Sequence, residues 1–106
     1  MEDCVFCKII KEEIPSSKLE ETENLLAIND INPQADTHIL IIPKNHIKDI
    51  TELNDSLWAE MKKLGLELVK ERGINNFRMT VNAGDAAAVH HMHMHLLGGI
   101  SEDRKI

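Results

Sequence analysis

The chain has 106 residues, of which 42% are hydrophobic, so residues 1–106 can form one hydrophobic core but not two. It carries 12 basic and 18 acidic residues, and the scattered Lys and Arg residues argue against a surface that follows a nucleic-acid backbone. The longest apolar runs fall far short of the ~20 residues that cross a bilayer, and the N-terminus has no secretory pattern. We therefore expect a single cytoplasmic domain without nucleic-acid or membrane partners.

The first half of the sequence predicts a short helix followed by three strands. The helix is expected from apolar residues at helical spacing before Pro15, namely Val5, Phe6, Ile9 and Ile10. The strands are expected where short apolar or β-branched segments lie between turn residues: Ser17 to Glu21, Asn24 to Asn29 and Thr37 to Ile42. Asp30 to Gln34 supplies the turn before the third strand.

The second half of the sequence predicts a long amphipathic helix and two further strands. The helix should run from Asp55 to Arg72, for about five turns, and end at Gly73. Its apolar stripe consists of Leu57, Met61, Leu64 and Leu68, widened by Trp58 and Val69. Strands are expected over Phe77 to Asn82 and His91 to Leu97. The element order predicts an α+β domain with an antiparallel sheet of about five strands, one long helix and a short N-terminal helix.

Residues 90–99, HHMHMHLLGG, contain four of the six histidines of the chain. In a strand, alternate side chains share a face, so His91, His93 and His95 would form one row of imidazoles. Imidazole can act as a nucleophile, as a proton donor or as a metal ligand. The spacing alone favours catalysis and metal binding equally.

The only cysteines, Cys4 and Cys7, have the CxxC spacing of redox and zinc motifs. A thioredoxin-like motif follows a strand, and no strand is expected before residue 4. Zinc is therefore the better interpretation, with two buried or free thiols as the alternative.

The histidine run and other segments together resemble the histidine triad superfamily, and within it the Hint-like branch. The matching segments are His91 to Gly99, Phe6 with Lys8 to Ile10, Glu13 to Pro15, Asp30 to Ala35, Thr37-His38, Ile42 to Lys44, and Asn82. The resemblance covers nearly the whole chain. It implies a nucleotide hydrolase or transferase that acts at an α-phosphate through a nucleotidyl-histidine intermediate.

The resemblance also implies roles for individual residues. His93 is the expected nucleophile, His95 holds the phosphate and assists the leaving group, and His38 orients the row. The remaining nucleotide-binding positions are Val5, Phe6, Ile9, Ile28, Asp30, Ile31, Leu40, Asn82 and Val89. Without the resemblance, each of these residues has a simpler interpretation. Asp30 would be a solvated turn residue, the apolar residues would pack in the core, and Asn82 would end a strand.

Zinc-bearing relatives imply a ligand set for the cysteines: Cys4, Cys7, His46 and His91. Four such ligands form a closed, structural zinc site. The resemblance further implies a purine nucleotide substrate, of the phosphoramidate or dinucleoside polyphosphate type, and a homodimer formed through the long helix and Phe77 to Asn82. His90 has no expected role.

The loop before the triad departs from the family pattern. It is short and contains Ala86, Ala87 and Ala88. Hint-like proteins carry amide and hydroxyl side chains at these positions. Each lost hydrogen bond to a charged group is worth roughly 1.5 to 3 kcal/mol, so weak turnover or a shifted substrate preference is expected. Two alternatives therefore stay open: a nucleotide-binding regulator with little catalysis, and a zinc-handling protein whose histidine row holds exchangeable metal.

Overall fold

A computed structural model of the protein describes residues 3–101. Its elements in chain order are α1 (Val5–Ile10), β1 (Ser17–Glu21), β2 (Leu25–Asn29), β3 (Thr37–Pro43), the 3-10 helix η1 (Ile50–Glu52), α2 (Asp55–Glu71), β4 (Phe77–Val81), the 3-10 helix η2 (Gly84–Ala86) and β5 (Met94–Gly98). The predicted α+β fold with five strands, one long helix and a short N-terminal helix is confirmed. In the described part of the chain, no helix is long and apolar enough to cross a membrane.

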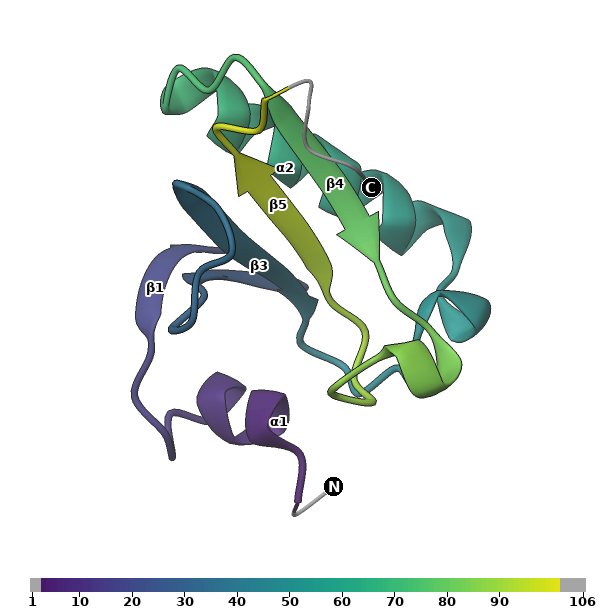
Figure 1. Ribbon diagram of the computed structural model, residues 1–106. Helices are drawn as coiled ribbons and strands as arrows, with labels where there is room; N and C mark the ends of the chain where they lie inside the picture. The colour runs from purple at the N-terminus through teal and green to yellow at the C-terminus, as the bar shows by residue number, and fades with distance from the viewer. Residues whose placement is uncertain (1–2, 102–106) are drawn as a thin grey trace.

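The five strands form one antiparallel sheet in the order β1-β2-β3-β5-β4, so β5 lies between β3 and β4 (Figure 1). In the register, His95 of β5 pairs with Leu40 of β3 on one side and with Thr80 of β4 on the other. Paired residues of adjacent strands share a face of the sheet. His95 therefore lies in the middle of the sheet, on the same face as Leu40.

The long helix α2 covers the opposite face of the sheet. The predicted stripe of α2, Leu57, Met61, Leu64 and Leu68, is buried against Ile39, Ile41, Met92, Met94 and Leu96. Asn54 caps the helix, because its side-chain oxygen accepts the Leu57 N–H at 2.8 Å. Gly65 allows a close approach to the sheet, since a Cβ there would lie 2.6 Å from Cε of Met79. The alternating apolar residues of β3 and β5 thus face α2.

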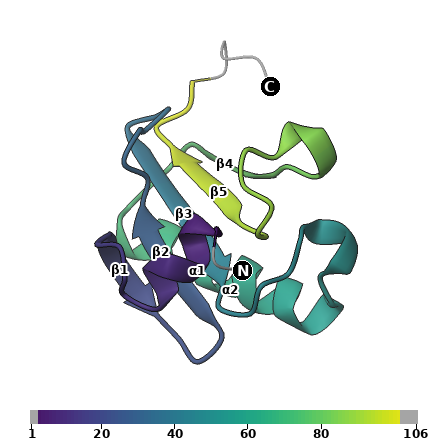
Figure 2. The same cartoon turned by 90° about the horizontal axis from the view of Figure 1, so that it is seen from below.

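The short helix α1 lies on the face of the sheet that carries His95, beside β1 to β3 (Figure 2). Phe6 of α1 is buried in a second apolar cluster with Leu26, Ile28, Leu40 and Ile42. Ile9, Ile10 and Val89 pack against this cluster. The N-terminal helix therefore closes one end of the sheet face on which the histidines lie.

Two predictions about single elements need correction. The last strand begins at Met94, so His91 and His93 precede it, because the Met92 N–H bonds the carbonyl of Ile47 at 2.6 Å instead of joining the ladder. The alternation of side chains nevertheless extends back to Met92, which is buried under α2. Trp58 does not widen the buried stripe of α2, because its side chain lies at the surface with 37% exposure.

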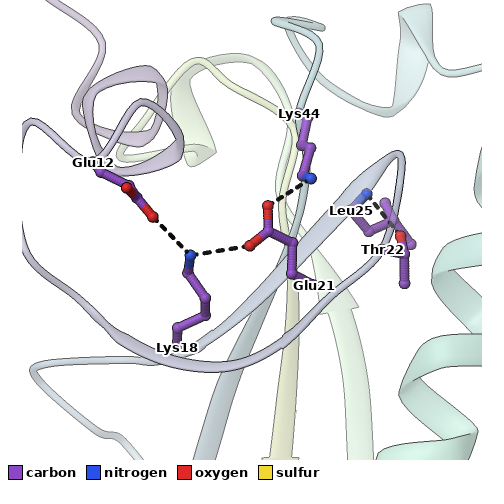
Figure 3. A network of polar contacts seen from close by, with 6 residues as sticks. All are labelled: Glu12, Lys18, Glu21, Thr22, Leu25 and Lys44. Atoms are coloured by element: carbon purple, nitrogen blue, oxygen red, sulfur yellow. Dashed lines mark hydrogen bonds and ion pairs between the residues drawn. The ribbon is translucent and has the colours of Figure 1, made fainter.

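A chain of ion pairs connects the end of α1 to the sheet (Figure 3). Lys18 of β1 contacts Glu12 at 3.2 Å and Glu21 at 3.0 Å, and Glu21 contacts Lys44 at 2.7 Å. Hydrogen bonds from Lys44 and then from Lys18 lower the pKa of Glu21 to about 2. The network ties the chain after α1 to the segment that leads from β3 to His46.

We expect the protein to form a homodimer through β4 and α2. The strand β4 is an edge of the sheet, and apolar side chains are exposed on β4 and α2, namely Phe77, Trp58 and Leu66. Light scattering at micromolar concentration should give twice the chain mass of 12.0 kDa, and Trp58→Glu should shift the mass toward the monomer. A stable monomer mass for the unmodified protein would contradict this prediction.

Candidate functional site

The structure brings the four predicted metal ligands together. Sγ of Cys4 lies 3.3 Å from Nδ1 of His91, and Sγ of Cys7 lies 3.3 Å from Nδ1 of His46 and 3.6 Å from Nδ1 of His91. All four ligand atoms lie within 4.8 Å of one another. Tetrahedral zinc, with bonds of about 2.3 Å to sulfur and about 2.0 Å to nitrogen, needs sulfur and nitrogen about 3.5 Å apart. The cluster therefore has the composition and the spacing of a four-ligand zinc site.

The surroundings of the two sulfur atoms affect how readily each carries the negative charge of a thiolate. Cys4 and Cys7 form no disulfide, and burial, followed by the neighbouring Cys4, raises the pKa of the Cys7 thiol. A bound metal would reverse this effect, because thiolates are its ligands. The Sγ of Cys4 also accepts the N–H of Cys7 at 3.4 Å, which caps α1 and stabilises negative charge on that sulfur.

Main-chain carbonyls fix the protonation of His91 and His93. A carbonyl oxygen can only accept, so Nε2 of His91 must donate its N–H to Pro43 O at 2.8 Å. This leaves Nδ1 of His91 unprotonated toward the cysteines. In the same way, Nδ1 of His93 donates its N–H to the carbonyl of His91 at 2.7 Å. In the neutral ring of His93 the lone pair therefore lies on Nε2, as a histidine nucleophile requires.

The ring of Phe6 supports the His93 side chain from α1. The two ring centroids are 4.9 Å apart with an interplanar angle of 73°, which is an edge-to-face contact. His93 is 6% exposed. Because Phe6 lies between Cys4 and Cys7, the segment that carries both cysteines also packs against the candidate nucleophile.

His38 and His95 form a second hydrogen-bonded pair beside His93. Nε2 of His38 lies 2.9 Å from Nδ1 of His95 and 3.4 Å from Oδ2 of Asp30. Burial, and then the neighbouring His93 and His38, lowers the pKa of His95 to about 4, against a smaller opposing effect of Asp30. His95 is therefore neutral near pH 7. The ring centroids of His93 and His95 are 5.0 Å apart, so both imidazoles can reach one phosphoryl group.

The expected nucleotide-binding residues differ in burial, and Asp30 among them is half-buried. Five of them lie in or against the apolar cluster under α1: Phe6, Ile9, Ile28, Leu40 and Val89. Val5 and Asn82 lie at the surface, and Ile31 is 95% exposed. Asn82 directly follows Val81, which pairs with Met94, so its backbone continues the register toward His93.

The loop before the triad is held by Asp49, which belongs to no motif in the sequence. Asp49 is 4% exposed and accepts hydrogen bonds from the N–H of Thr51 at 2.9 Å and of Gly84 at 3.4 Å. Hydrogen bonds from Thr51, with a further one from Gly84, lower the pKa of Asp49, against the opposing effect of burial. An Asp two residues before a Thr-Glu pair resembles many helix caps, so the sequence gives no sign of its contact with Gly84.

A hollow of about 450 Å³ lies between the metal cluster and this loop. It is lined by Asp3, Cys4, Val5, His46, Ala88, Val89 and His90. His90 is exposed and belongs neither to the metal cluster nor to the histidine pair. The hollow therefore joins the two nucleotide-binding candidates Val5 and Val89 to the outer edge of the metal cluster.

Known proteins share both the fold and the motif. The family model for scavenger mRNA decapping enzyme C-term binding matches residues 3–105. The solved HIT family hydrolase of Clostridium thermocellum is 44% identical, with a TM-score of 0.91 over 100% of this chain and 98% of its own. The 14 kDa zinc-binding protein of Zea mays is 45% identical over 90% of this chain and 80% of its own. The adenosine 5'-monophosphoramidase of Saccharomyces cerevisiae is 40% identical over 89% of this chain and 61% of its own. The chain belongs to the histidine triad (HIT) superfamily.

Proposed function

We propose that residues 1–106 are one HIT domain that acts on a purine nucleotide at its α-phosphate, as a hydrolase or transferase, through a nucleotidyl-histidine intermediate on His93. The observation that carries this proposal is the 2.7 Å hydrogen bond from Nδ1 of His93 to the His91 carbonyl. It keeps the ring proton on Nδ1 and leaves the lone pair of Nε2 available for attack. The names of the hydrolase and monophosphoramidase relatives support the same class of reaction.

The reaction consists of two displacements at phosphorus. In the first, Nε2 of His93 forms a bond to the α-phosphorus, and the bond from phosphorus to the leaving group breaks. In the second, water or another acceptor attacks the same phosphorus and releases His93 with its original lone pair. His95 holds a phosphate oxygen and assists the leaving group during both steps, because charge develops on the phosphoryl oxygens there.

The nucleoside is held by the groups beside the histidine pair. The base packs against the apolar residues under α1, where Phe6, Ile28 and Leu40 are buried and Val5 and Ile31 are exposed to receive it. Asp30 accepts the sugar hydroxyls. One of its oxygens already accepts the Asn32 N–H at 2.8 Å, but a carboxylate has further lone pairs. The side-chain amide of Asn82 donates an N–H to a phosphate oxygen.

We propose that the metal of the Cys4, Cys7, His46 and His91 cluster is zinc and that its role is structural. A zinc ion there would supply the positive charge that keeps both cysteines as thiolates. Two thiolates and two imidazoles would hold the ion without an open position for water. Residues of the chain itself, above all His91 through its carbonyl, then position His93.

A second function is favoured by the loop before the triad. Ala86 and Ala88 are exposed there and offer neither a hydroxyl nor an amide to a leaving group. A nucleotide-binding regulator that turns over slowly would keep the pocket and lose these contacts. Binding of nucleotide with negligible turnover would identify such a protein.

The test of the proposed function is a substrate screen of the purified protein. We expect release of nucleoside monophosphate from at least one of four classes: adenosine phosphoramidates, guanosine phosphoramidates, dinucleoside polyphosphates and aminoacyl adenylates. Chromatography with ultraviolet detection measures the product. A protein that neither binds nor cleaves any of these compounds would exclude the proposed function.

A further inference from the structure

Both ring nitrogens of His38 are engaged in hydrogen bonds of defined direction. Nδ1 lies 3.0 Å from the main-chain N of Gln34, and Nε2 lies 2.9 Å from Nδ1 of His95. A main-chain N–H can only donate, so Nδ1 of His38 must accept and carries no proton. The proton of the neutral ring therefore lies on Nε2, and His38 donates it to His95.

The tautomer of His38 determines the tautomer of His95. Nδ1 of His95 accepts the proton of His38, so in neutral His95 the ring proton lies on Nε2, the nitrogen away from His38. A protonated Nε2 is a hydrogen-bond donor. The neutral ring of His93 has the opposite arrangement, because its donated N–H is on Nδ1 and its lone pair is on Nε2. Two neighbouring imidazoles are thus held in complementary states, one as a nucleophile and one as a donor.

We propose that the main-chain amide of Gln34 fixes His38 as a permanent hydrogen-bond donor, so that His38 is a positioning residue that keeps His95 as an Nε2–H donor to the reacting phosphoryl group. The two tautomers follow from the hydrogen bonds alone, whereas their effect on turnover rests on the proposed function. Gln34 gave no sign of such a role in the sequence, because its contribution comes from the main chain.

The turn that presents the Gln34 amide is internally bonded. Oδ1 of Asp30 accepts the Asn32 N–H at 2.8 Å, and the Gln34 side chain donates to the Asn32 carbonyl at 3.1 Å. The Asp30 N–H bonds the carbonyl of His38 at 2.9 Å, which closes the turn onto β3. His38 itself is only 6% exposed. Water therefore has little access to replace the Gln34 amide at Nδ1.

The tautomer assigned to His38 also affects whether a second cluster of potential metal ligands can bind a metal ion. Atoms of Asp30, His38 and His95 lie within 4.8 Å of one another. A metal on Nε2 of His38 would displace its proton to Nδ1, where the proton would face the Gln34 N–H. This donor–donor contact opposes metal binding. Exchangeable zinc in the histidine row, as in a zinc-handling protein, is therefore disfavoured.

The tautomers can be measured directly, without any substrate. In protein with isotope-labelled histidine, long-range proton–nitrogen correlation NMR distinguishes protonated from unprotonated ring nitrogens. We expect the Nε2–H form for His38 and His95. His38 in the Nδ1–H form, or an equal mixture of the two forms, would overturn the proposal. This result does not depend on whether the protein hydrolyses nucleotides, so it separates the proposal from the proposed function.

Two substitutions of similar size test the consequence for turnover. In His38→Gln the amide nitrogen replaces Nε2 as a donor that cannot change tautomer, whereas in His38→Glu the carboxylate can only accept. We expect His38→Glu to lower kcat by about 10² or more, as loss of an oriented donor does, with a smaller effect on KM. His38→Gln should retain at least about ten times the kcat of His38→Glu.

Equal losses of kcat in the two variants would show that His38 must change its own protonation state, and would overturn the proposal. Circular dichroism and the melting temperature establish that each variant is folded before the comparison. If either variant is unfolded, the NMR measurement on the unmodified protein decides the question. If the unmodified protein has the expected tautomers but cleaves no nucleotide, the proposed function fails and the tautomer assignment stands.

Discussion

Replacement of His93 by alanine should abolish turnover while nucleotide still binds. The substitution removes the imidazole nitrogen proposed for attack, because Nδ1 of His93 donates to the His91 carbonyl and the lone pair of the neutral ring lies on Nε2. His95 and the apolar cluster under α1 remain. We expect the rate of nucleoside monophosphate release to fall by about 10⁴ or more, with a change in nucleotide Kd of less than about tenfold. Single-turnover kinetics and calorimetric titration measure the two quantities.

His90→Ala is the matched control, because it removes a histidine from the same run that is exposed and outside both clusters. Because His90 lines the hollow beside Val5 and Val89, the comparison is made at saturating nucleotide, where its turnover should stay close to that of the unmodified protein. Mass spectrometry after an alkaline quench should detect the nucleotidyl adduct in the control and not in His93→Ala. Turnover of His93→Ala near the unmodified rate would exclude a covalent intermediate on this residue.

The purified protein should contain about one zinc per chain, and removal of the metal should destabilise the fold strongly. The four ligands join the N-terminal segment, the loop after β3 and the segment before β5, and Cys4 and His91 are 87 positions apart. The unfolded chain lacks this assembled site, so binding energy contributes to folding. We expect chelation or Cys4→Ala to lower Tm by on the order of 10 °C or more. Activity should fall only through loss of order near His93.

Elemental analysis of protein purified without added metal or chelator measures the zinc content, and differential scanning calorimetry measures Tm. Val5→Ala is a suitable control, because Val5 lies between the two cysteines but is exposed and offers no ligand atom. It should keep the zinc. A protein without zinc, or Cys4→Ala with unchanged zinc, would mean that the cysteines are packing residues and that His91 belongs to the active-site row.

Sequence periodicity predicts much of this fold because burial follows it closely. The bounds of β1 agree with the prediction, and the stripe of Leu57, Met61, Leu64 and Leu68 is buried as expected. The start of β5 was not predictable in this way. Side chains alternate from His91 onward, but strand pairing depends on where the main-chain N–H of Met92 bonds, and residue type carries no such information.

For the candidate site, too, some features could be predicted from the sequence and others depend on the folded main chain. The CxxC spacing indicated zinc, and the resemblance to zinc-bearing relatives implied the two histidine ligands; the structure brings Cys4, Cys7, His46 and His91 within contact distance. What each imidazole can do depends on three main-chain groups: the carbonyls of Pro43 and His91 and the amide of Gln34. Every residue has such groups, so their effect on protonation appears only once the chain is folded.

The position of β5 in the sheet has a consequence for how the protein is made. This strand follows all the others in the sequence, yet it lies between β3 and β4, and β4 has no other neighbour within the described sheet. During synthesis, Cys4 and Cys7 leave the ribosome more than 80 residues before His91, which lies 87 and 84 positions later. Closing so long a loop is entropically costly, and pairings of this sequence separation form slowly. A nascent chain that ends before residue 91 therefore has an open sheet and lacks one of the four proposed metal ligands, and the proposed catalytic residues His93 and His95 arrive together with the segment that completes the fold.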